Sequence, residues 1–151
     1  MLLAKMVHIL AAVIWVGGMF FAYMALRPAA ANLLEPPQRL SLWDGVFTKF
    51  FVWVWISIAA ILLTGYYMLM AHFGGFAGSG TYIHIMHGLG LVMVMLFMHV
   101  YFAPYRRLKR LVAESNFPEA GKNLNTIRKL VAINLTIGII TIVIAVAAKQ
   151  I

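Results

Sequence analysis

The 151-residue sequence has no cysteine and only four acidic residues. Without cysteine, disulfides, thiolate metal sites and cysteine nucleophiles are all excluded. Charged residues of both signs make up 11% of the chain, against roughly a quarter in a typical water-soluble domain, whereas 64% of it is hydrophobic. This shortage of polar surface excludes an ordinary soluble domain and indicates a membrane protein.

Four apolar runs dominate the chain, and each has about 20 residues, enough for a helix to cross a hydrocarbon core of about 30 Å. The sequence predicts an all-α membrane protein, a single domain folded as a four-transmembrane-helix up-down bundle. The helices are expected at residues 6–26, 50–71, 82–104 and 130–148. The first run is too long for the apolar part of a secretory signal and is interpreted as a structural helix. The glycine-rich residues 74–80 make the second and third helices antiparallel neighbours.

Basic residues outnumber acidic ones by 12 to 4, which gives a formal net charge of +8. In a soluble chain this excess would favour nucleic acid as a partner, but here it sets the topology, and the expected partner is the lipid bilayer. One side of the predicted bundle holds only Lys5 and Lys149. The other side holds Arg27, Arg39, Lys49, Arg106, Arg107, Lys109, Arg110, Lys122, Arg128 and Lys129. The positive-inside rule therefore predicts cytoplasmic loops and periplasmic N and C termini, in a bacterial inner (plasma) membrane.

The segments between the apolar runs also carry local signals. Residues 106–115 are predicted to continue the third helix beyond the membrane. Asn116 and Pro118 are typical of a stop followed by a new helix start. Residues 38–51 mix charged and apolar side chains, which favours a segment lying at the membrane interface before the second helix enters.

Histidine is the residue type that carries the chemistry at membrane depth. All four carboxylates fall in the predicted cytoplasmic loops, so carboxylate proton relays and Mg²⁺ sites inside the bilayer are excluded. Four of the five histidines, His8, His72, His84 and His87, are expected in the outer part of the bundle. His99 lies about 22 Å deeper than His84 by helical rise and belongs to the inner half.

Two kinds of occupant suit imidazole donors in such a bundle: a haem iron or copper. For haem, His8 and either His84 or His87 are the candidate axial ligands, and Gly17, Gly18, Gly65, Gly88 and Gly90 offer room for a macrocycle or a neighbouring helix. For copper, the candidate ligands are His8, His72, His84, Met86 and His87. His84 and His87 share a helix face because they are three residues apart. A third interpretation leaves every histidine hydrogen-bonded as packing.

Two stretches resemble a known family: residues 5–20, KMVHILAAVIWVGGMF, followed by LRPAA at 26–30, and residues 99–108, HVYFAPYRRL. They look like the CopD copper-resistance membrane proteins, which are similar in architecture to membrane b-type cytochromes and to HemJ-type protoporphyrinogen oxidases. The resemblance implies a haem-carrying four-helix bundle and a role in copper uptake or periplasmic copper handling. It matches His8, His84 and His99 to histidines of the family. Met86 stands where the HemJ type has lysine, which separates this chain from those oxidases.

The leading hypothesis is a b-type haem protein that transfers single electrons near the periplasmic face. Its partner would be a quinone, superoxide, or a periplasmic copper or redox protein. The alternative is a copper-binding transport or resistance component without haem. One haem per chain is expected, because His99 has no second histidine at its depth. A homodimer would supply that second histidine.

Overall fold

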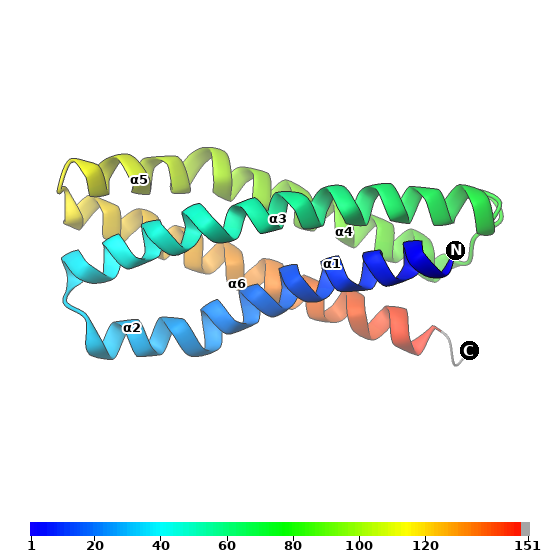
Figure 1. The fold of residues 1–151 in the computed structure, drawn as a ribbon, viewed down its shortest axis with the longest axis horizontal. Coiled ribbons are helices and arrows are strands. Elements are labelled where there is room, and N and C mark those ends of the chain that lie inside the picture. Colours follow the sequence, from blue (N-terminus) through cyan, green and yellow to red (C-terminus); the bar gives the residue numbers. More distant parts are fainter. Residues whose placement is uncertain (149–151) are drawn as a thin grey trace.

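The computed structural model describes residues 1–148 and consists of four long helical rods (Figure 1). In chain order the elements are α1 (Leu2–Phe21), η1 (Ala22–Leu26), α2 (Arg27–Leu33), α3 (Pro36–His72), α4 (Thr81–Val100), η2 (Tyr101–Tyr105), α5 (Arg106–Ala113) and α6 (Phe117–Ala147). The segments α1–η1–α2 form the first rod and α4–η2–α5 the third. All four rods are long and apolar enough to cross a membrane, and residues 1–148 contain no strand. The predicted all-α four-helix class is confirmed.

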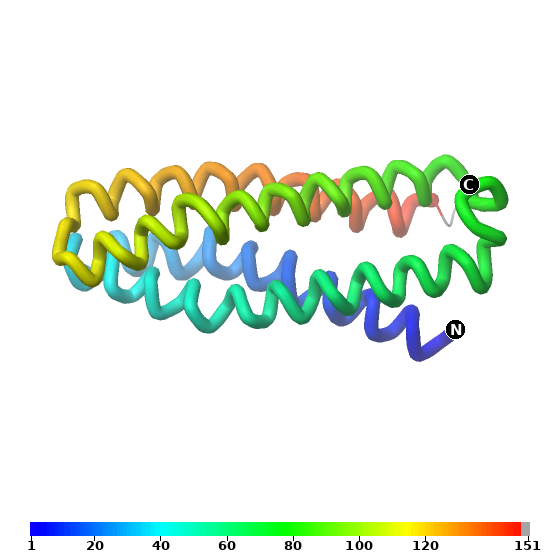
Figure 2. The backbone as a smooth tube through the Cα atoms, turned by 90° about the horizontal axis from the view of Figure 1, so that it is seen from above, coloured from blue at the N-terminus to red at the C-terminus, as the bar shows by residue number. Residues whose placement is uncertain are grey.

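Successive rods run in opposite directions, which confirms the up-down topology (Figures 1 and 2). The turns at residues 34–35 and 114–116 lie together at one end, here called the basic end. The start of α1, the loop at 73–80 and the end of α6 lie at the other, here called the terminal end. The rods extend well beyond the apolar runs, because the polar segments at the basic end continue the same helices.

The four rods pack as two close pairs. The backbone of α1 runs beside α3, and α4 and α5 run beside α6. The glycine loop makes α3 and α4 antiparallel, as predicted, but these two helices meet mainly through large side chains. The ring of Trp55 on α3 lies 5.2 Å from that of Phe97 on α4 and 5.6 Å from that of Tyr101. Aromatic rings at this spacing fill the gap between backbones that stand further apart.

Small residues allow the close approach of α1 to its neighbours. A Cβ atom at Gly18 would overlap the ring of Phe50 on α3, and one at Gly138 of α6 would lie 2.9 Å from Val16. Helices in lipid pack by such close approach, because lipid tails offer no hydrophobic driving force for their association. The prediction that glycine gives neighbouring groups room therefore holds at Gly18. Gly17, Gly88 and Gly90 face open space.

The segment at residues 38–51 differs from the prediction, because it is an integral part of α3. Leu40, Trp43 and Phe47 are buried and recur every three or four residues, so they share the helix face that enters the bundle. The ring of Phe47 stacks on Phe51 at 5.1 Å, and Phe51 meets Tyr105 edge-on at 4.9 Å. Burial against the third rod, rather than attraction to an interface, decides the path of this segment.

Each of the first and third rods contains one wider, π-helical turn close to a proline. Pro104 lies inside η2, where it supplies no N–H and its ring crowds the preceding turn, and the wider turn accommodates both effects. At η1, the N–H of Arg27 donates to the carbonyl of Ala22, one residue further back than in an α-helix, immediately before Pro28. The rods therefore continue through both prolines.

The start of α6 follows the sequence prediction. The third rod ends at Ala113, Asn116 is the N-cap of α6, and Pro118 lies in its first turn. The Asn116 side chain accepts a hydrogen bond from the N–H of Glu119 at 3.4 Å. The cap satisfies one of the donors that a helix start leaves open.

Candidate metal site at the terminal end

His8 lies on α1 near the terminal end, half-buried against α3. Its Nδ1 atom is 2.9 Å from Oγ1 of Thr64. Its ring also lies over Gly65, because a Cβ atom there would stand 3.2 Å from Cε1 of His8. The sequence alone indicated Gly65 as a position of close approach, and the group that approaches it is the imidazole of His8. Thr64 was not identified from the sequence.

The hydrogen bonds of Thr64 favour the tautomer of His8 that carries its proton on Nδ1. The Thr64 hydroxyl is placed to donate its single hydrogen to the carbonyl oxygen of Ala60, one turn earlier on α3. With that hydrogen engaged, its oxygen accepts from His8, and Nδ1 of His8 is the donor. In the neutral ring, Nε2 then carries the lone pair. Metal-binding histidines are oriented in this way, by a second partner on the other ring nitrogen.

One further soft donor shares the α3 face that His8 contacts. Met68 is half-buried and lies one helical turn beyond Thr64, so the two side chains project from the same side of α3. The thioether of methionine is a donor that Cu(I) accepts. The pairing of α1 with α3 thus brings an oriented imidazole to the helix face that carries a thioether.

A second group of donors lies at the start of α4. The exposed His84 donates from Nδ1 to the carbonyl oxygen of Gly80 at 3.2 Å, which leaves its Nε2 with the lone pair. The ring of His87 is half-buried between aromatic rings, 5.1 Å from Phe76 and 5.4 Å from Tyr66. Its Nε2 lies 3.5 Å from the hydroxyl of Tyr66, at the limit of a hydrogen bond. Met86, between the two histidines in sequence, is half-buried.

The remaining two histidines differ in their level along the bundle. His72 is the last residue of α3, is exposed, and packs edge-on against Phe73 with the ring centres 5.2 Å apart. His99 is exposed in the last turn of α4, and within residues 1–148 its side chain makes no hydrogen bond. His99 is therefore separated along the bundle from the other four, as its sequence position predicts.

The terminal-end histidines share one end of the bundle but divide between two sides of α3. His8 contacts the face of α3 formed by Thr64 and Gly65, whereas His87 contacts Tyr66. Along the bundle α1 packs beside α3, whereas α4 packs beside α6. Among residues 1–148, no three His, Cys, Asp or Glu side chains converge on one metal position. The fold therefore supplies two separate donor groups, one between α1 and α3 and one on α4.

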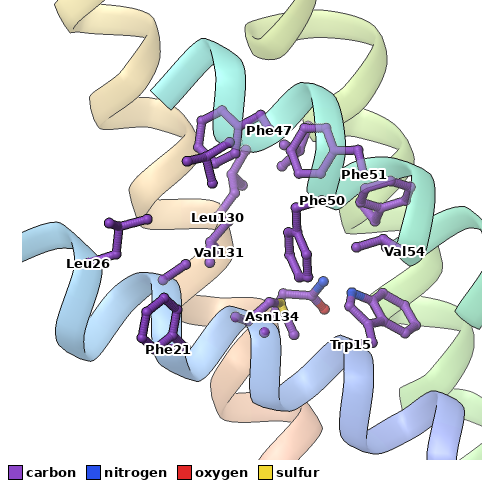
Figure 3. Close-up of a pocket in the computed structure, with 16 residues that line it drawn as sticks. Trp15, Phe21, Leu26, Phe47, Phe50, Phe51, Val54, Leu130, Val131 and Asn134 are labelled. Atoms are coloured by element: carbon purple, nitrogen blue, oxygen red, sulfur yellow. The ribbon is translucent and has the colours of Figure 1, made fainter. Parts of the chain in front are cut away.

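An apolar cavity of about 390 Å³ lies deeper in the bundle, among α1, α3, α4 and α6 (Figure 3). Phe50, Phe51 and Trp15 line it, and no histidine does. Asn134 of α6 also lines it and is only 4% exposed. The Asn134 side chain donates to the carbonyl of Met93 at 3.4 Å, while its own Oδ1 is buried without a partner within the described chain. This buried amide was not identified from the sequence.

Comparison with known proteins supplies the chemical context of this bundle. Residues 44–148 match the family described as copper resistance protein D, CopD. The chain belongs to the CopD family. The match covers α3 from Asp44 onward together with α4, η2, α5 and α6, and with the four apolar rods it identifies a copper-resistance-related, multi-pass membrane protein. No curated protein and no solved structure matches the chain.

Proposed function

We propose that this CopD-family protein binds copper ions at the terminal end of the bundle, as a membrane component of copper transport or resistance. The observation that carries the proposal is the chain of hydrogen bonds from His8 through Thr64 to Ala60. It leaves Nε2 of His8 as an oriented ligand at an end of the bundle that also carries methionine. Copper is the metal that both the donor types and the family favour.

The two donor groups have different roles in this proposal. His84, Met86 and His87 are the entry donors, because His84 is exposed at the start of α4 and its Nε2 is open to an incoming ion. His8 and Met68 are the inner donors, because both are half-buried between α1 and α3. Cu(I) accepts ligands of the imidazole and thioether type, and each group offers it a small set of such donors.

Haem is the other occupant that the histidines suggested, and the arrangement of the helices supports it less well. A haem with two axial imidazoles needs them on opposite faces of one macrocycle. His8 contacts Thr64 and Gly65 of α3 whereas His87 contacts Tyr66, and the apolar cavity is lined by other residues. Among residues 1–148 no histidine lines the apolar cavity, which supports copper rather than a bis-histidine haem as the proposed occupant.

The first experiment is a metal analysis and an absorption spectrum of protein purified in detergent from cells supplied with both haem and copper. The expected result is stoichiometric copper without a Soret band. His8→Ala and the triple variant His84→Ala, Met86→Leu, His87→Ala should each lower the bound copper, and His99→Ala serves as the matched control. A Soret band that His8→Ala removes would replace copper with haem. Protein with neither metal would leave the histidines as packing residues.

The orientation of the bundle is part of the proposal: the terminal end faces the periplasm of the inner membrane, so the entry donors meet periplasmic copper. The excess of basic residues at the opposite end supports it. Because the chain has no cysteine, single cysteines report sidedness directly. A membrane-impermeant maleimide should label Ala77→Cys in intact spheroplasts and Glu114→Cys only after lysis. The reverse pattern would turn the copper site toward the cytoplasm.

A further inference from the structure

A second cavity, of about 700 Å³, lies at the basic end among η1, α2 and the first turns of α3 and α6. Three arginines from three different helices line it: Arg27 of α2, Arg39 of α3 and Arg128 of α6. They are far apart in sequence, and the packing of the rods brings them to one place. The distribution of basic residues along the sequence predicts that the three arginines lie on the same side of the membrane, but it does not indicate that they line one cavity.

The three arginines line one cavity, and none of them forms an ion pair with a carboxylate among residues 1–148. Arg27 and Arg39 lie near enough to act electrostatically on Arg128. The ion pairs among residues 1–148 are Arg110 with Glu114 and Lys122 with Glu119, and neither includes an arginine of the cavity. None of the three arginines of the cavity is therefore held in an ion pair with a carboxylate of residues 1–148.

The arginines are held partly inside the protein rather than extended into water. All three are half-buried, and the guanidinium of Arg27 lies over the ring of Tyr23 at 4.8 Å. The Nε atom of Arg128 is buried and has no hydrogen-bond partner within the described chain. A buried donor without a partner costs free energy, and more so when the group is charged. The three like charges repel one another more strongly because they are partly shielded from water. A bound anion relieves this repulsion and also gives the Nε donor a partner.

The N-termini of two helices add partial positive charge to the cavity. α3 begins at Pro36 and α6 at Phe117, and both residues line the cavity together with Pro118. The N-terminus of a helix carries a partial positive charge, which favours an anion beside it. Guanidinium groups pair with phosphate oxygens through two parallel hydrogen bonds.

We propose that the cavity lined by Arg27, Arg39 and Arg128 binds a phosphate group, carried either by the headgroup of an anionic phospholipid or by a free phosphate ion. The three arginines supply the charge and the hydrogen-bond donors, and the buried Nε of Arg128 is the donor that the ligand satisfies. The site lies at the end of the bundle opposite the histidines. It stands whether or not the protein binds copper.

The test measures binding to protein purified in a neutral detergent, with two probes at constant ionic strength: inorganic phosphate and phosphatidylglycerol. The matched controls are sodium chloride and phosphatidylcholine, whose headgroup has a phosphate but no net charge. Thermal unfolding reports binding, because a ligand of the folded state raises the Tm. A higher Tm in inorganic phosphate without added lipid assigns the site to a free ion. A higher Tm only with phosphatidylglycerol assigns it to a lipid headgroup. No rise with either probe would overturn the proposal.

The variants separate a built site from general attraction to a basic surface. The double variant Arg27→Gln, Arg128→Gln should weaken binding about tenfold or more, as the loss of charge-assisted hydrogen bonds implies. Arg107→Gln removes a charge from an exposed position on α5, outside the cavity, and should bind as the wild type does. Equal weakening in both variants would reduce the effect to surface charge and refute the site.

A second measurement guards against variants that fold poorly. Without any added anion, Arg128→Gln should unfold at the same temperature as the wild type or higher, because it removes repulsion and a charged donor without a partner. Arg128→Lys should keep part of the affinity, since it retains the charge but not the planar fork. A lower Tm for Arg128→Gln in anion-free buffer would assign the arginine a structural role and contradict the proposal.

Discussion

Replacing Thr64 with valine isolates the contribution of the hydrogen bond that orients His8. Valine keeps the shape of threonine but cannot accept a hydrogen bond from the N–H of Nδ1. In the structure this bond joins Nδ1 to Oγ1 of Thr64 at 2.9 Å. The ring then loses the partner that fixes its tautomer and its orientation over Gly65. A residue that hydrogen-bonds to the second ring nitrogen of a metal-binding histidine typically contributes about 10- to 100-fold in metal affinity, which corresponds to roughly 1.4 to 2.7 kcal/mol.

The assay is a titration of Cu(I) against a chromophoric chelator, with the protein in detergent. Thr64→Val should release copper to the chelator at about one tenth of the wild-type chelator concentration or less. Thr64→Ser keeps the hydroxyl and should restore binding. Thr141→Val is the matched control, because Thr141 donates to the carbonyl of Ile137 in the same way but has no histidine partner. Equal copper affinity in Thr64→Val and Thr141→Val would refute the orienting role of Thr64.

Three further substitutions follow from the packing. Gly65→Ala puts a Cβ atom 3.2 Å from the His8 ring and should weaken copper binding, whereas Gly17→Ala meets open space and should leave it unchanged in the same titration. Gly18→Ala overlaps the ring of Phe50 and should lower stability by about 1 to 3 kcal/mol, measured as a lower midpoint in denaturant; an unchanged midpoint would mean that α1 and α3 are further apart than described. Asn134→Leu removes a buried acceptor without a partner and should leave the Tm unchanged or raise it, and a clear fall would show that the amide has a partner in the membrane.

The architecture is predictable from the sequence because each rod contains one long apolar run. The runs fix the number of helices and their alternating direction. The ends of the helices are harder to predict, because residues 38–51 and 117–129 are amphipathic. Mean hydropathy does not distinguish a helix inside the bundle from a segment at the interface. Leu40, Trp43 and Phe47 show their common face only once a third rod is present to bury it.

The candidate site was predictable at the level of residues but not of contacts. His8 is conspicuous because an ionisable group at membrane depth is costly. Its partner is Thr64, far away in sequence, and which threonine faces it depends on the register of α1 against α3. The same is true of Arg27, Arg39 and Arg128, whose convergence depends on how the rods meet at the basic end. Sequence position gave the level of each histidine, whereas the side of α3 on which it lies needed the packed bundle.

X-ray absorption spectroscopy at the copper edge tests the central claim most directly, because it reports the atoms bound to the metal. Copper-loaded wild-type protein should show nitrogen neighbours with the outer-shell scattering of imidazole, and His8→Ala should reduce that signal while His99→Ala leaves it unchanged. Identical spectra for the wild type and His8→Ala, at equal copper content, would contradict the assignment of Nε2 of His8 as a ligand.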